Sequence, residues 1–289
     1  MHAVKRRTFC RPLIGHGSVC LLSQIKAQRR ASADAFHHGK GGPAPGSQER
    51  KAEKQREASM TQKPIAAGPR AAVIEARIPP IGLPGTLQVP DAADAVVAFA
   101  HGSGSSRFSP RNVAVADALN RQGIATLLFD LLTEEEEADR ANVFDIPLLA
   151  GRLVDAVNWL DREPRARSLP RGLFGASTGA AAALVAAARL GERIGAVVSR
   201  GGRPDLAGGA LETIRTPTLL IVGGADFRVI ELNRQAFARL RGPKALEIVP
   251  GASHLFPERG ALETVIDHAA RWFRRYLARV PAERAGQTT

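Results

Sequence analysis

Cysteine is scarce in this sequence, and both cysteines, Cys10 and Cys20, lie near the amino terminus. Residues 61–289 therefore offer no disulfide, no four-cysteine zinc site and no cysteine nucleophile. Runs of 18 or more apolar residues are absent as well, which excludes a membrane-spanning helix and predicts that no membrane is a partner.

The net charge of +12 would suit a nucleic-acid partner if it were evenly spread. Residues 1–60, however, hold 12 of the 40 Lys+Arg and 4 of the 28 Asp+Glu, a net of +8, which leaves only +4 for the rest of the chain. That larger part shows no basic stripe interleaved with aromatics. We therefore expect no specific nucleic-acid partner, and only non-specific binding of polyanions by the tail remains as an alternative.

The amino-terminal segment contains too little apolar surface to fold. Residues 37–59 include no Val, Ile, Leu, Phe, Tyr or Trp, so they cannot offset the entropy of ordering. We predict a disordered basic tail over residues 1–60 and one domain over 61–289. Arg6-Arg7 and the following segment are weakly similar to a twin-arginine export signal. We favour a start at Met60 and a cytoplasmic protein, with export as the alternative.

From residue 71 onward, apolar runs of strand length alternate with segments of helical spacing. The first two strands, joined around Pro79 and Pro80, suggest an antiparallel edge hairpin. The alternation predicts an α/β fold, with a doubly wound, mostly parallel sheet of about seven or eight strands flanked by helices and no large lid domain. The predicted strands are 71–78, 86–89, 94–100, 124–129, 172–174, 194–198, 217–222 and 245–249; the predicted helices are 110–122, 146–160, 178–190, 229–240 and 262–277.

A G-x-S-x-G turn at Gly175, Ser177 and Gly179 joins a predicted strand to an Ala-rich helix. In a nucleophile elbow, small residues at these positions let strand and helix approach closely while the serine takes a strained backbone conformation. Ser177 is therefore the candidate nucleophile. The alternative is an ordinary Gly-rich strand-to-helix turn.

Two further residues follow predicted strands in the order that a Ser-Asp-His triad of this fold requires. Asp226 comes after residues 217–222, and His254 comes after residues 245–249. We predict that His254 is the general base and that Asp226 fixes its tautomer. Asp205 is the rival acid, although it lies early in the chain for this role. His268 falls within a predicted helix.

The Gly/Ser-rich segment 101–106 follows another predicted strand, where the oxyanion loop of such a fold lies. We expect the N–H groups of Ser103 and Thr178 to face the developing oxyanion, with Gly104 as a neighbour. A phosphate-binding nest is the alternative.

The HGSGSS, GASTG, GGADFRV and PGASHLF segments together resemble the dienelactone-hydrolase-like branch of the α/β-hydrolase superfamily over residues 71–277. The resemblance implies that neither a metal nor an organic cofactor is needed. Dienelactone-opening enzymes use a cysteine nucleophile, and the matching residue here is Ser177. This departure favours a serine esterase or another acyl hydrolase.

Three arginines near the predicted site are candidates for binding an acidic group of a small-molecule acyl substrate: Arg107, Arg200 and Arg203. The alternative for Arg200 or Arg203 is a structural ion pair with Asp205 or Glu231. The predicted activity is hydrolysis of a small ester, lactone or other acyl substrate through an acyl-enzyme. An acyltransferase on the same triad and a non-catalytic binding module are the alternatives, and the sequence does not predict the oligomeric state.

Overall fold

The computed structural model describes residues 71–278. The predicted tail over residues 1–60, the segment similar to an export signal and both cysteines lie outside the described residues.

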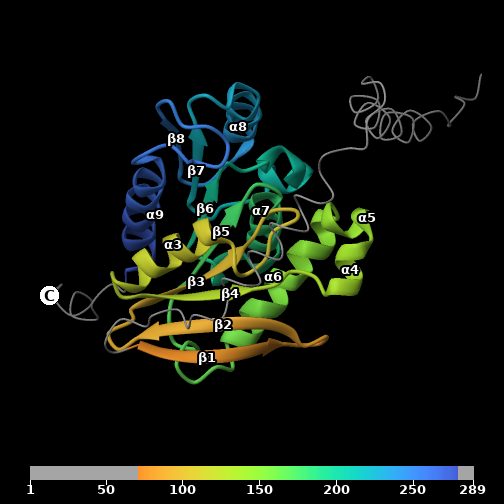
Figure 1. The fold of residues 1–289 in the computed structure, drawn as a ribbon, viewed down its shortest axis with the longest axis vertical. Helices are drawn as coiled ribbons and strands as arrows, with labels where there is room; N and C mark the ends of the chain where they lie inside the picture. Colours follow the sequence, from red (N-terminus) through yellow and green to blue (C-terminus); the bar gives the residue numbers. More distant parts are fainter. Residues whose placement is uncertain (1–70, 279–289) are drawn as a thin grey trace, which may run out of the picture. The chain divides into compact units, whose positions relative to one another are not determined.

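Eight strands form one sheet with the order β1-β2-β4-β3-β5-β6-β7-β8 (Figure 1). The hairpin of β1 and β2 lies at one edge and pairs antiparallel within itself and with β4, while the pairs from β4 to β8 are all parallel. The predicted fold class is confirmed. The strands are β1 Ala71–Ile78, β2 Leu83–Pro90, β3 Ala95–Ala100, β4 Ile124–Phe129, β5 Arg171–Ala176, β6 Ala196–Arg200, β7 Thr218–Gly223 and β8 Lys244–Val249.

Helices cover both faces of this sheet and close two apolar layers. Buried side chains of α6 and α7 form one layer with the sheet, and buried side chains of α3 and α9 form the other. Figure 1 shows these two pairs on opposite sides of the strands. The helices are α3 Pro110–Asn120, α4 Glu134–Ala138, α5 Arg140–Val143, α6 Ile146–Leu160, α7 Thr178–Leu190, α8 Phe227–Arg239 and α9 Ala261–Leu277, with 3-10 segments η1 Gly191–Arg193 and η2 Pro204–Glu212.

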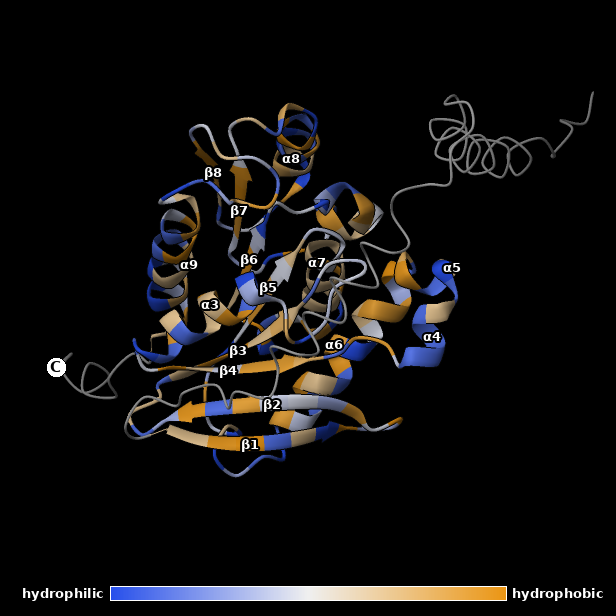
Figure 2. Cartoon of the chain, in the orientation of Figure 1, coloured by the Kyte–Doolittle hydropathy of each residue, from blue (hydrophilic) through white to orange (hydrophobic). Residues whose placement is uncertain are grey.

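The central strands are buried on both faces, which explains their continuous apolar runs. Every residue of β3, β4, β6 and β7 is buried. Figure 2 shows the resulting contrast between the apolar strands and the hydrophilic α4, whose sequence is EEEEA.

Several boundaries differ from the prediction. The acidic region around residues 133–144, in which no element was predicted, forms α4 and α5. A capping box on Thr133 starts α4, because the Thr133 hydroxyl accepts from the Glu136 N–H and the Glu136 carboxylate accepts from the Thr133 N–H. Strand β6 runs to Arg200 rather than ending at residue 198, so Arg200 belongs to the sheet and not to the following loop.

No large insertion follows any strand at the carboxyl edge of the sheet. The segment between β6 and β7 is occupied mainly by η2, which packs against α7 and α8. Within residues 71–278, no helix combines the length and the apolar character needed to cross a bilayer.

Candidate active site

Ser177 occupies the strained position between β5 and α7. Its backbone has φ 50° and ψ −120°, a conformation that costs a non-glycine residue about 1–3 kcal/mol. Glycines on both sides make room for the turn: a Cβ on Gly175 would lie 2.4 Å from the Ala180 Cα, and one on Gly179 would lie 2.3 Å from the Ala100 carbonyl oxygen. The strand and helix therefore meet as a nucleophile elbow requires.

The end of β6 connects the elbow to the histidine loop. The Ser177 N–H donates to the Arg200 carbonyl over 3.3 Å, and the Ser177 carbonyl accepts from the Arg203 N–H over 3.0 Å. Between these two arginines, Gly201 has φ +50°, and a Cβ there would lie 2.8 Å from the His254 carbonyl oxygen and 3.7 Å from its Nδ1. Ser177 and His254 therefore both adjoin the same short turn.

His254 and Asp226 form a close pair, with 2.7 Å between the His254 Nδ1 and the Asp226 Oδ2. A carboxylate at this distance holds the proton on Nδ1 and leaves the Nε2 lone pair free to accept another proton. The N–H of Ser253, which precedes the histidine, donates to the Glu258 carboxylate over 3.0 Å. This hydrogen bond holds the loop that carries His254 in place. The rival acid, Asp205, is hydrogen bonded to Arg203 instead.

The predicted oxyanion loop lies against Ser177. A Cβ on Gly102 would lie 3.0 Å from the Ser177 Cβ, so a side chain there would push the serine by a few tenths of an ångström. The next N–H, that of Ser103, donates to the Thr178 hydroxyl oxygen over 2.9 Å. Gly104 has φ +70° and open space around its Cα. The loop and the elbow thus lie next to each other, and the Ser103 N–H, expected to face an oxyanion, already has an acceptor.

His101 fixes the orientation of this loop, a role that sequence reasoning missed. Its buried Nε2 accepts from the Leu131 N–H over 3.1 Å, so the ring proton is on Nδ1, which lies 3.0 Å from the Gly102 carbonyl and donates to it. Burial lowers the pKa of His101 and favours this neutral form. The detectable signal was a histidine between a buried strand and a glycine-rich loop.

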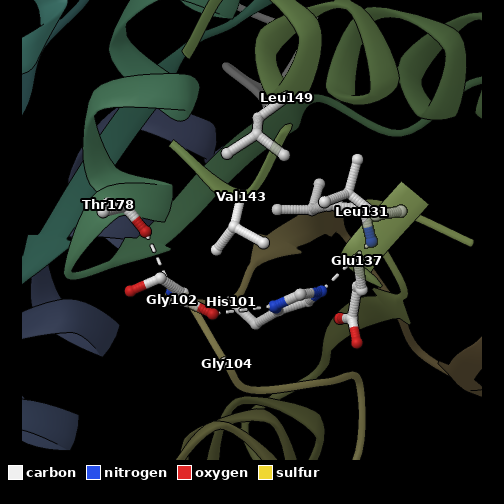
Figure 3. A pocket seen from close by; sticks show the side chains of 10 residues that line it. His101, Gly102, Gly104, Leu131, Glu137, Val143, Leu149 and Thr178 are labelled. Carbon is white, nitrogen blue, oxygen red and sulfur yellow. Dashed lines mark hydrogen bonds between the residues drawn. The ribbon is translucent and has the colours of Figure 1, made fainter. Parts of the chain in front are cut away.

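A small cavity of about 10 Å³ opens beside these groups (Figure 3). The oxyanion loop and Thr178 border one part of it, and Glu137 and apolar side chains including Leu131, Val143 and Leu149 border the rest. Figure 3 shows the Thr178 hydroxyl directed at the loop that carries Gly102 and Gly104. Within residues 71–278, no cluster of three or more His, Cys, Asp or Glu side chains is arranged to hold a metal ion.

The three predicted arginines differ in their partners. Arg107 forms an ion pair with Asp130, and Arg203 forms a two-bond pair with Asp205. Arg200 is only 6% exposed, and its Nε and Nη1 have no hydrogen-bond partner among the described residues. Burial and the positive charge of Arg111 lower its pKa to about 10, so it remains a cation at neutral pH.

An eight-stranded, mostly parallel sheet with an elbow serine and a following acid and histidine defines the class of α/β hydrolases. No family model matches the chain. It is similar to a crystal structure of a dienelactone hydrolase from Anabaena variabilis, with 52% identity, a TM-score of 0.69, and coverage of 72% of this chain and 98% of that one. A serine hydrolase without lid from Xanthomonas campestris shares the fold, at 22% identity and a TM-score of 0.59, with 74% and 98% of the two chains covered.

The chain belongs to the dienelactone-hydrolase-like branch of the α/β hydrolases. Curated relatives from two strains of Mycobacterium tuberculosis are 59% identical over 194 residues, which is 67% of this chain. They carry a provisional name as phosphoribosyl transferases. The chain spans only 44% of the length of those relatives.

Proposed function

We propose that this protein is a serine hydrolase that cleaves a small ester, lactone or other acyl substrate through an acyl-enzyme. The observation that carries the proposal is the strained Ser177 at the same sheet edge as the 2.7 Å His254–Asp226 pair. The strain has a use in a hydrolase, because it raises the hydroxyl above the strand where a substrate carbonyl can reach it.

In the first step, the Ser177 Oγ attacks the acyl carbon while the His254 Nε2 takes the hydroxyl proton. The π electrons of the carbonyl move to its oxygen, which becomes an oxyanion. As the tetrahedral intermediate collapses, the bond to the leaving alcohol breaks and the proton passes from His254 to that alcohol. Water then repeats the sequence on the acyl-enzyme and releases the acid. Asp226 stabilises the His254 imidazolium both while the acyl-enzyme forms and while water hydrolyses it.

Acyl substrates that carry a negative group suit this site best. Arg107 and Arg203 are neutralised by Asp130 and Asp205, whereas Arg200 has no acidic partner within residues 71–278. A buried guanidinium without a counter-ion is costly, and a substrate carboxylate or phosphate would offset that cost. Arg200 ends the strand next to the elbow strand, and its carbonyl already accepts from the Ser177 N–H.

Labelling with a fluorophosphonate probe tests the hydrolase proposal. Wild-type protein should be labelled and Ser177→Ala should not. Ser199→Ala is the matched control, because this buried serine lies on the neighbouring strand and its hydroxyl has no partner among the described residues. Absence of labelling in the wild type, or labelling of Ser177→Ala at the wild-type rate, would overturn the proposal and favour a binding module.

A panel of neutral and acidic acyl esters tests the substrate class. Arg200→Gln should weaken hydrolysis of the acidic esters more than of the neutral ones, whereas Arg203→Gln, which breaks the pair with Asp205, should affect both alike. Equal losses for both kinds of ester in Arg200→Gln would remove the role of Arg200 in recognising an anion.

A further inference from the structure

The oxyanion hole expected from the sequence has two backbone donors, the N–H groups of Ser103 and Thr178. In the structure, the Ser103 N–H already donates to another group. An N–H group carries a single hydrogen, and that of Ser103 points at the Thr178 hydroxyl oxygen, 2.9 Å away. Its peptide plane is held from the other side, since the Gly102 carbonyl accepts from His101. Turning the Ser103 N–H toward a substrate would therefore break contacts that lock the loop.

The Thr178 hydroxyl accepts one hydrogen bond and retains a hydrogen of its own. Within residues 71–278, no acceptor takes that hydrogen, although Thr178 is only 4% exposed. A buried hydroxyl hydrogen usually finds a partner. Thr178 also borders the small cavity beside the oxyanion loop (Figure 3). Gly102 borders the same cavity and adjoins Ser177, since a Cβ on Gly102 would lie 3.8 Å from the Ser177 Oγ.

Thr178 directly follows the nucleophile and opens α7. Its backbone N–H is among the first of the helix and has no carbonyl partner one turn back. The N–H and the hydroxyl belong to one residue and move together with Ser177, whereas the donors of the loop depend on the separate segment 101–106. Both groups of Thr178 thus belong to the residue next to the attacking serine, and the Ser103 N–H holds the hydroxyl oxygen in place.

We propose that the Thr178 hydroxyl is a catalytic donor of the oxyanion hole, acting beside the Thr178 N–H in the place expected for the Ser103 N–H. This inference rests on the proposed hydrolase function. As the Ser177 Oγ bonds to the acyl carbon, the carbonyl oxygen gains the π electron pair and accepts hydrogen bonds from the hydroxyl and the N–H of Thr178. The Ser103 N–H donates to the hydroxyl oxygen and, by polarising it, strengthens the donor. No proton leaves Thr178.

The opposing possibility is that the hydroxyl is only a placeholder, that is, a group that accepts the Ser103 hydrogen bond until a substrate replaces it. In that case its oxygen would occupy the oxyanion position in the resting protein and rotate away when substrate binds, leaving the Ser103 N–H to act. The two cases predict opposite results when the hydroxyl is removed, because a placeholder competes with the substrate and a donor assists it.

The experiment compares Thr178→Val with Thr178→Ser on matched esters whose reacting group is C=O or C=S. Valine keeps the branched shape without the hydroxyl, and serine keeps the hydroxyl. Sulfur is the weaker hydrogen-bond acceptor, so a lost donor matters less for the thionoester. Both substrates are measured on one enzyme preparation, and the ratio of their kcat values is independent of the folded fraction.

We expect Thr178→Val to lower kcat for the oxygen ester by about 10²-fold, the usual effect of losing one oxyanion donor. The loss for the thionoester should be less than tenfold, with KM little changed, and Thr178→Ser should retain most activity. Equal losses on both esters, or unchanged or increased activity in Thr178→Val, would overturn the inference. Failure of the hydrolase proposal looks different: wild-type turnover would then be absent or would persist in Ser177→Ala.

Discussion

The two halves of the candidate site are built in contrasting ways. The half at β3 and β5 holds Ser177 and the oxyanion loop through close backbone contacts at Gly102, Gly175 and Gly179. The half at β7 and β8 holds the acid and the base through one side-chain hydrogen bond, and the side chains of His254 and Asp226 are 39% and 16% exposed.

The strands beneath the two halves differ as well. Strand β3 is fully buried between neighbours, whereas β8 is an edge strand whose residues are mostly half-exposed. The nucleophile half therefore depends on the packing of the fold, and the acid–base half depends on the chemistry of two side chains. Substitutions of the closely packed glycines in the first half should reduce stability, and those of His254 and Asp226 in the second should reduce activity with the fold intact.

The sharpest test of this contrast is His254→Ala. Loss of the proposed base should lower kcat by about 10⁶-fold, because the members of a catalytic triad act as a unit. The melting temperature should stay close to that of the wild type, since the side chain is partly exposed. Ester hydrolysis and thermal unfolding measured on one sample test both points, and a large fall in melting temperature would contradict the separation of the two halves.

Asp226→Asn should have the next largest effect. The amide cannot hold the proton on the His254 Nδ1 as the carboxylate does, and we expect kcat to fall by about 10⁴-fold. Asp205→Asn is the matched control, because this residue pairs with Arg203. A comparable loss of kcat in the control would transfer the role of the acid to Asp205.

In the nucleophile half, Gly179→Ala should cost stability first. The new Cβ would lie 2.3 Å from the Ala100 carbonyl oxygen, which is backbone and cannot move aside, and such overpacking costs about 3 kcal/mol. Gly209→Ala has open space around the added Cβ and should change the free energy of unfolding by less than about 0.5 kcal/mol. Urea denaturation measures both, and equal midpoints would contradict the proposed packing.

The smallest effect is a dependence of stability on pH through His101. Its pKa is lowered in the folded protein from the ordinary value of 6.5, so below that pH the unfolded chain binds the proton more readily. The free energy of unfolding should therefore fall as the pH drops, by at most about 1.4 kcal/mol per pH unit from this residue. Urea midpoints at pH 7.5 and 5.5 should differ less in His101→Asn than in the wild type. His268→Asn is the control, and an unchanged difference in His101→Asn would refute the role of His101.

Most of the fold could be predicted because its signals are local in the chain. Continuous apolar runs give the buried strands, and helical spacing gives the flanking helices. The short acidic α4 was not predicted, since its start depends on the reciprocal hydrogen bonds of Thr133 and Glu136 rather than on an apolar face. The candidate triad was predictable because its members follow strands that end at one edge of a parallel sheet.

The partners of the individual side chains were not predictable in the same way. The three arginines look alike in the sequence, and only the folded chain pairs Arg107 with Asp130 and Arg203 with Asp205 while leaving Arg200 buried. The contact between Ser103 and Thr178 joins residues 75 positions apart. No local pattern encodes such a contact.

The sequence by itself therefore determined the class of fold, the order of Ser177, Asp226 and His254, and the exclusion of a cysteine nucleophile from residues 61–289. Only the tertiary structure decided that the Ser103 N–H donates to the Thr178 hydroxyl and that His101 fixes the loop of residues 101–106. The physical reason is that periodicity and turn chemistry act between near neighbours in the chain. The destination of a hydrogen bond, in contrast, depends on which distant groups the packed sheet brings within about 3 Å.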